Sequence, residues 1–164
     1  MATTAKYILL LDVEESLSMG LDLATNPDIK HTIPGGFGNL TATTTVPATK
    51  VISDTRSLTA GADTIDLTSM GGPYNTTVTF AGLKVQLLKI KSDATNGAVL
   101  VVEKGATNGY ELFGDTSGQI AVPPGGEALF FFNDGLADVS GGAKTIDFSS
   151  IDTNATYSII LVAG

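Results

Sequence analysis

Short runs rich in Val, Ile, Thr and Phe recur along this chain, separated about every ten residues by Gly, Asn, Asp or Pro. Branched and aromatic residues favour strands, and the turn residues between them prevent any longer element from forming. This spacing is typical of an all-β sandwich or barrel. We therefore predict strands over the ranges 6–13, 40–46, 49–58, 63–68, 76–80, 83–91, 98–103, 119–122, 127–133, 144–148 and 155–163.

Helical periodicity is weak throughout the chain. Only Glu14 to Leu23 has a helical pattern, and Gly20 weakens it. The strand at 83–91 has mixed alternation, which predicts that both of its faces are partly covered. Asn96-Gly97 lies between two apolar runs and is a strong hairpin signal, because both residue types tolerate positive φ.

The first part of the chain differs in composition from the rest. Residues 24–48 hold three of the six prolines, a Gly-Gly pair and a threonine-rich run. They form either a flexible arm or an extended segment laid over the body. We favour an ordered extension over residues 1–48 that packs on the body or on a neighbour, followed by a sandwich domain over 49–164. The apolar residues that would anchor the extension are Ile29, Ile33, Phe37 and Leu40.

One motif occurs twice. The segment from Ala62 to Met70 reads ADTIDLTSM, and the segment from Ala143 to Ile151 reads AKTIDFSSI. The favoured interpretation is two similar edges of a Greek-key sandwich. The alternative is a pair of equivalent binding sites built on Asp66 and Asp147.

Charge and cysteine content exclude several classes of function. The net charge is −8, from 17 acidic and 9 basic residues. An acidic chain is unsuited to broad contact with nucleic acid or with an anionic membrane surface. The chain has no cysteine, which excludes disulfides, thiolate nucleophiles and the usual structural zinc sites. No apolar run has the roughly 20 residues needed to span a bilayer, and no signal peptide is recognisable.

Catalytic chemistry has few candidates. His31 is the single histidine, and Ser16, Ser53 and Ser57 can be nominated as nucleophiles, but none of them lies in a G-x-S-x-G context. We predict that the chain is not an enzyme and has no cofactor. Oxygen ligands for calcium exist, although their spacing matches no EF-hand, so we predict no metal site. These oxygen ligands are Asp134, Asp138, Asp147, Asp152 and Asn154.

Turn and strand motifs from about Val46 to the C-terminus carry a family resemblance. They are Pro47–Lys50, Thr64–Thr68, Gly82–Gln86, Asn108–Gly114, Val122–Gly126, Ala143–Asp147 and Tyr157–Val162. In these motifs the chain resembles small jelly-roll virion proteins of tailed bacteriophages. The resemblance implies an antiparallel β-sandwich of jelly-roll type and a head decoration, or cement, protein that binds assembled capsid. It supplies no catalytic residues.

The leading hypothesis is therefore a virion structural protein, synthesised in the host cytoplasm. Its expected partners are the major capsid protein and further copies of itself, for example in a trimer, with no nucleic acid and no membrane. The expected contact residues are Ile29, Ile33, Phe37 and Leu40. The alternative is a receptor- or glycan-binding domain of a tail fibre, with a site around Tyr110, Phe113 and Asp115.

Overall fold

The structure is a computed structural model that describes residues 3–9, 11–16, 28–33, 37–72, 74 and 76–164. The described elements are all strands, and they form antiparallel sheets, so the predicted all-β class is confirmed. The chain divides into two compact units. We call the first, Met1–Ala5 with Leu40–Gly164, the body, and the second, Lys6–Asn39, the N-terminal unit.

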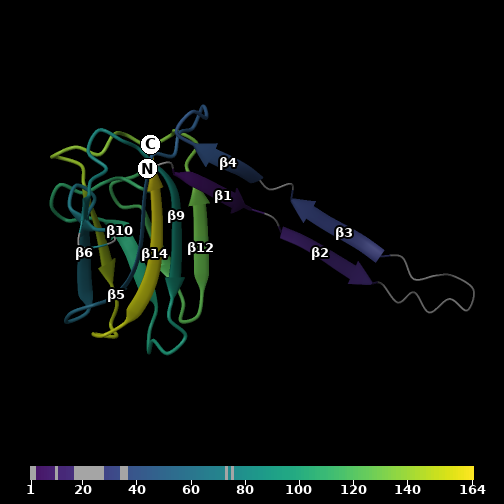
Figure 1. The fold of residues 1–164 in the computed structure, drawn as a ribbon. Coiled ribbons are helices and arrows are strands. Elements are labelled where there is room, and N and C mark those ends of the chain that lie inside the picture. Colours follow the sequence, from purple (N-terminus) through teal and green to yellow (C-terminus); the bar gives the residue numbers. More distant parts are fainter. Residues whose placement is uncertain (1–2, 10, 17–27, 34–36, 73, 75) are drawn as a thin grey trace, which may run out of the picture. The chain divides into compact units, whose positions relative to one another are not determined.

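Two four-stranded sheets make up the body (Figure 1). In sheet order, the first sheet comprises β12 (Glu127–Phe131), β9 (Val85–Ser92), β14 (Thr156–Ala163) and β5 (Lys50–Ser57). The second sheet comprises, in the same way, β11 (Gln119–Val122), β10 (Leu100–Lys104), β13 (Thr145–Ser149) and β6 (Ala62–Asp66). A short pair, β7 (Met70–Gly71) with β8 (Thr77–Val78), lies between β6 and β9 in the chain.

The eight long strands of the body pair in a nested order. The first, β5, pairs with the last, β14, and the second, β6, pairs with the second-last, β13. In the same way β9 pairs with β12, and β10 pairs with β11. The steps from β5 to β6, β9 to β10, β11 to β12 and β13 to β14 each pass from one sheet to the other.

A single apolar core lies between these sheets. Leu88 and Ile90 from the first sheet and Val102 and Ile146 from the second are fully buried in one cluster. The rings of Phe148 and Tyr157 stack at a centroid distance of 4.3 Å and join β13 to β14. Burial of both inner faces against each other is the packing of a β-sandwich.

The mixed alternation predicted for β9 is confirmed. Leu88 and Ile90 face the core, and Val85 at the start of the strand belongs to the same cluster. On the opposite parity, Leu87 is only 5% exposed although it alternates with the exposed Lys89 and Lys91. Both faces of β9 are therefore covered at one end of the strand.

Three predicted strands differ from the structure. The range 6–13 is two strands, β1 (Thr4–Ile8) and β2 (Leu11–Ser16), and the range 76–80 contains only the two residues of β8. The range 40–46 was wrong beyond residue 41, where β4 (Phe37–Thr41) ends. The Thr44 hydroxyl donates to the Thr41 carbonyl at 2.9 Å. Such local hydrogen bonds favour a turn over a strand.

The helical pattern at Glu14 is also corrected. Leu11 to Ser16 form β2, which pairs with β3 (Asp28–Ile33). Pairing along the whole of β2 satisfies the backbone groups that face β3, which outweighs a weak helical pattern. Positions 17–23 of the predicted helix lie outside the described residues.

Asn96-Gly97 does not make a hairpin. The flanking strands β9 and β10 belong to different sheets, because β9 already has β12 and β14 on its two sides. The Asn96 side chain is 9% exposed and binds the backbone of Thr156, donating to its carbonyl and accepting from its N–H, each at 2.8 Å. These bonds hold the connection against the start of β14 instead of closing a two-residue turn.

The N-terminal unit is built from paired strands. β2 and β3 are antiparallel, with Leu11 opposite Ile33 and Val13 opposite His31. β1 pairs with β4, and the Tyr7 ring lies so close to Gly38 that a Cβ there would be 2.9 Å from the ring. An aromatic ring packed over a strand glycine compensates for the missing side chain.

Candidate binding sites

The duplicated motif pairs with itself. β6 and β13 are antiparallel neighbours, with Ile65 opposite Ile146 at the centre, and Thr64 opposite Asp147. The interpretation as two similar edges is therefore wrong for the second copy, because β13 lies between β10 and β6. Nested pairing brings the two copies, about 80 residues apart in the chain, side by side as the second and second-last long strands of the body.

Both carboxylates of this motif are engaged by their own chain. Asp147 accepts hydrogen bonds from the Thr64 hydroxyl at 2.7 Å and the Ala106 N–H at 2.8 Å. Asp66 lies 2.6 Å from the Lys144 ammonium and also accepts from Thr68. The hydrogen bond from Lys144 lowers the pKa of Asp66 below its usual range. These contacts assign the two carboxylates a role in holding strands and turns together.

A partly buried ion pair was not foreseen. Arg56, the only arginine, contacts Asp63 through Nε at 2.6 Å and Nη2 at 2.8 Å. The Tyr157 hydroxyl donates to the same carboxylate at 2.7 Å. The signal in the sequence was Arg56 on the same strand parity as the buried Ile52, which places the guanidinium toward the core side of β5.

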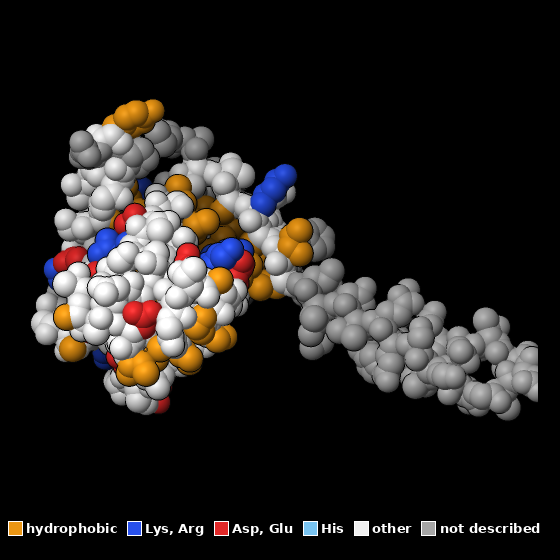
Figure 2. Space-filling view, turned by 90° about the horizontal axis from the view of Figure 1, so that it is seen from below, with side chains coloured by type: hydrophobic (Ala, Val, Ile, Leu, Met, Phe, Trp, Pro, Cys, Tyr) orange, Lys and Arg blue, Asp and Glu red, His pale blue; other side chains and the backbone are white. Residues whose placement is uncertain are grey.

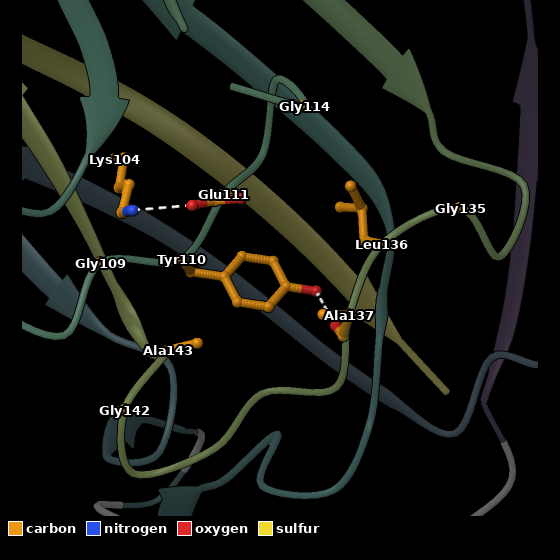
Figure 3. A pocket seen from close by; sticks show the side chains of 10 residues that line it. All are labelled: Lys104, Gly109, Tyr110, Glu111, Gly114, Gly135, Leu136, Ala137, Gly142 and Ala143. Atoms are coloured by element: carbon orange, nitrogen blue, oxygen red, sulfur yellow. Dashed lines mark hydrogen bonds and ion pairs between the residues drawn. The ribbon is translucent and has the colours of Figure 1, made fainter. Parts of the chain in front are cut away.

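A cleft of about 380 Å³ opens at one end of the body (Figure 3). Its walls are mainly glycine and alanine, so backbone forms much of the surface. Lys104 and Glu111 meet across it, with 2.8 Å between Nζ and Oε1 (Figure 3). The lining residues are Lys104, Gly109, Tyr110, Glu111, Gly114, Gly135, Leu136, Ala137, Gly142 and Ala143.

Tyr110 forms the floor of this cleft and holds two chain segments together. Its hydroxyl donates to the Ala137 carbonyl at 2.6 Å and accepts from the Val85 N–H at 3.2 Å. Burial raises the pKa of Tyr110, so the hydroxyl stays protonated as a donor. With its one cation and one carboxylate already paired, the cleft offers backbone groups for binding and no group placed for proton transfer.

The residues proposed for glycan recognition do not form an exposed aromatic platform. Tyr110 is 1% exposed, and the Phe113 ring packs edge-on against Phe130 at 5.5 Å. The Asp115 carboxylate accepts hydrogen bonds from Thr116 and Ser117 within its own turn. These three residues shape a loop rather than present a stacking surface.

The predicted contact residues are distributed over both units. Ile29 and Ile33 lie in β3, opposite Glu15 and Leu11, and Phe37 is the first residue of β4. Leu40 belongs to the body and is 5% exposed, so it acts as an internal anchor. Contact with another chain stays a prediction for all four residues.

The candidates for catalysis and for calcium are scattered. His31 pairs with Val13 and Ser16 pairs with Asp28, while the Ser57 hydroxyl lies 3.1 Å from that of Thr156. In the part of the chain that the structure describes, no three His, Asp or Glu side chains gather as metal ligands do. The four aspartates considered for calcium therefore do not gather as a group of three or more ligands.

Apolar groups also reach the surface of the body. Ile151 is 92% exposed and Val99 is 41% exposed, and both line a shallow hollow of about 580 Å³. Figure 2, which views the molecule from below, shows groups of apolar side chains among a surface of the body that is mainly uncharged. On the outer face of the first sheet, Val51 is 45% and Ile160 is 41% exposed.

Comparisons with protein-family models, with curated proteins and with solved structures give no match to this chain. Among the described residues, no helix is long and apolar enough to cross a membrane.

Proposed function

We propose that this chain is a virion structural protein that binds an assembled phage capsid and stabilises or decorates it. Its partners are the major capsid protein and further copies of itself, as in a trimer. The mechanism is burial of surface between proteins, which for a stable contact takes roughly 1,000 Å² or more.

The nested strand pairing is the observation that carries the proposal. Eight strands in two sheets, pairing first with last and second with second-last, support a jelly roll of two Greek keys. Jelly rolls are recurrent in viral capsid domains and in lectins. The buried Tyr110 and the ring packing of Phe113 against Phe130 favour the capsid assignment over a lectin-like site at this loop.

The N-terminal unit supports the same assignment. Opposed residues of a strand pair belong to one face, so four apolar positions share a face of the β2–β3 pair with Glu15 and His31. These four are Leu11, Val13, Ile29 and Ile33. Lys30 and Thr32 belong to the other face. A two-stranded element is marginally stable alone in water, so a face with four apolar positions out of six is suited to burial against a partner.

Binding to assembled capsids that lack this chain tests the proposal. The double variant Ile29→Asn, Ile33→Asn should bind at least about tenfold more weakly, because it removes two apolar residues from one face. The control is Lys30→Asn, Thr32→Asn on the opposite face of the same strand, which should bind within about threefold of the unmodified chain. Co-sedimentation over a concentration series measures both. Equal binding by the two double variants, or no binding by the unmodified chain, would contradict the proposal.

A further inference from the structure

The chain contains two Asn-Gly pairs, Asn96-Gly97 and Asn108-Gly109. Asparagine is a thermolabile residue, because the backbone nitrogen of the next residue can attack its side-chain amide. Glycine leaves that nitrogen accessible, since it has no Cβ to shield it. The two pairs therefore have the same intrinsic reactivity, and their surroundings in the fold decide whether each of them reacts.

Asn96-Gly97 is held at both of its reacting groups. The Asn96 amide nitrogen donates to the Ser92 hydroxyl at 3.0 Å and to the Thr156 carbonyl at 2.8 Å. The Asn96 amide oxygen accepts from the Thr156 N–H at 2.8 Å, and the Gly97 N–H donates to the Asp152 carboxylate at 2.7 Å. An attack of the Gly97 nitrogen on the Asn96 amide must break several of these hydrogen bonds, so the fold protects this pair.

Asn108-Gly109 is free at both of its reacting groups. Asn108 is exposed, and within the described chain neither its side-chain amide nor the Gly109 N–H has a hydrogen-bond partner. The φ of Asn108 is 53°, in the left-handed region that asparagine tolerates. Position 109 also requires glycine, because a Cβ there would collide with the Gly105 carbonyl oxygen and the Lys104 side chain. The fold therefore demands the residue that makes Asn108 reactive.

Backbone N–H groups around Asn108 stabilise the charge that this reaction develops. The attacking form of the Gly109 nitrogen is the deprotonated amide, whose negative charge is shared with the Asn108 carbonyl oxygen. That oxygen accepts hydrogen bonds from the Lys144 N–H at 2.7 Å and from the Thr145 N–H at 3.0 Å. Hydrogen bonds to a charged form favour that form, and two backbone donors at a developing oxyanion act as an oxyanion hole does.

We propose that Asn108 is a site of spontaneous deamidation, with water as the co-reactant. The Gly109 nitrogen loses its proton to solvent and forms a bond to Cγ of Asn108. The bond from Cγ to the side-chain nitrogen breaks, and that nitrogen takes a proton from solvent and leaves as ammonia. The result is a succinimide ring. Water then adds to one ring carbonyl, whose bond to the ring nitrogen breaks as this nitrogen regains a proton.

The succinimide opens to two products. Opening at Cγ gives aspartate, and opening at the main-chain carbonyl gives isoaspartate, in which the peptide bond runs through the side chain. The N–H groups of Lys144 and Thr145 polarise the main-chain carbonyl, so they favour opening there. Either product places a negative charge at position 108, beside the cleft that Gly109 lines. This modification goes beyond the proposed function and does not depend on capsid binding.

Ageing of the folded chain in mildly alkaline buffer, followed by proteolysis and mass spectrometry, tests the proposal. Asn108 should convert at least about tenfold faster than Asn96, because the reaction at Asn96 must first break several hydrogen bonds. In concentrated urea the fold is lost, and the two rates should come within about threefold of each other. Asn108→Gly is the matched control, since it suits the positive φ and has no amide, and it should show no conversion at this position.

Each outcome of this experiment decides the inference. An Asn108 that stays intact in the folded chain, or that converts no faster than Asn96, overturns the proposal. A difference between the two sites that persists in urea also overturns it, because the fold would then not be its cause.

Electron-transfer fragmentation distinguishes isoaspartate from aspartate at position 108 and tests the two N–H donors separately. The share of isoaspartate should be higher in the folded chain than in urea, because only the folded chain places the N–H groups of Lys144 and Thr145 on the main-chain carbonyl. An equal share in both conditions would overturn the role assigned to these donors.

Discussion

Asp63 shows how one residue stabilises the junction of the two sheets. It is 14% exposed and accepts hydrogen bonds from Arg56 on β5 and Tyr157 on β14. Burial by itself would raise the pKa of Asp63, but the hydrogen bonds from Arg56 and Tyr157 outweigh it and hold the pKa below its usual range. The charged carboxylate is therefore the form that the fold stabilises.

Replacement of Asp63 by Asn should lower the free energy of unfolding by about 1–2 kcal/mol at pH 7, a value kept low because the Arg56 side chain is 34% exposed and solvent screens the pair. A lowered folded-state pKa gives stability that is complete well above the unfolded value of about 3.9, declines below that value and is lost as the pH falls through the folded-state pKa. Urea unfolding between pH 7 and pH 2 should show the difference between variant and wild type shrinking in acid.

Asp54→Asn is the control for this prediction. Asp54 lies on β5, the strand that carries Arg56, and makes one longer contact with the Arg56 guanidinium, at 3.3 Å. Asp54→Asn should lower the free energy of unfolding by less than Asp63→Asn does at pH 7. If Asp54→Asn lowered the free energy of unfolding by as much as Asp63→Asn, the role assigned to Asp63 would be contradicted. The same holds if the difference in this free energy between Asp63→Asn and wild type stayed constant down to pH 2.

At the scale of elements, the connections between sheets decide the topology. The link from β9 to β10 carries a hairpin signal in its sequence, yet the Asn96 side chain binds the Thr156 backbone and the Ser92 hydroxyl. An asparagine can satisfy a backbone N–H and C=O together, as a neighbouring strand would. The two hydrogen bonds between the Asn96 side chain and Thr156 take the place of a backbone pair where the chain leaves the first sheet.

Asn96→Ala should destabilise the body by about 1–3 kcal/mol, because it leaves the partly buried Thr156 N–H without its partner and removes one of the two hydrogen bonds to the Thr156 carbonyl, which keeps the Asp93 N–H. Thr95→Ala removes an exposed hydroxyl from the same turn and should change stability by no more than about 0.5 kcal/mol. Thermal or urea unfolding measures both. Similar stabilities for the two variants would show that Asn96 does not hold this connection.

At the scale of the whole molecule, strands of the two units differ in how many neighbouring strands and core contacts hold them. β9 and β14 each have strands on both sides and side chains in the main core. β2 and β3 pair only with each other in the described part of the chain. Local opening is easiest where few buried apolar contacts hold the backbone.

Hydrogen exchange followed by mass spectrometry should therefore find the slowest amides in β9 and β14 and fast exchange in β2 and β3 at dilutions that favour a monomer. At high concentration, or on capsids, the amides of β2 and β3 should become protected. Protection of β2 and β3 equal to that of β9 at every concentration would show that the N-terminal unit needs no partner.

The alternating apolar residues and the turns between them were sufficient to predict the all-β class and most strands of the body. β9, β11 and β14 are examples, because strand alternation depends on neighbours two residues apart. The turn at Thr44, the continuation of β2 from Glu14 to Ser16 and the whole of β3 were missed. At these places, hydrogen bonds among nearby backbone and hydroxyl groups or with a partner strand outweighed the local pattern.

Tertiary structure alone decided which strands are neighbours. The repeated Thr-Ile-Asp was visible in the sequence, but only folding placed Thr64 against Asp147 and Ile65 against Ile146. Arg56 with Asp63, and Tyr110 beneath the cleft, likewise depend on packing between segments distant in the chain. The sequence by itself determined a chain of short strands with few candidates for chemistry, because propensity and composition are local. Pairing order arises from contacts between distant segments that no local pattern records.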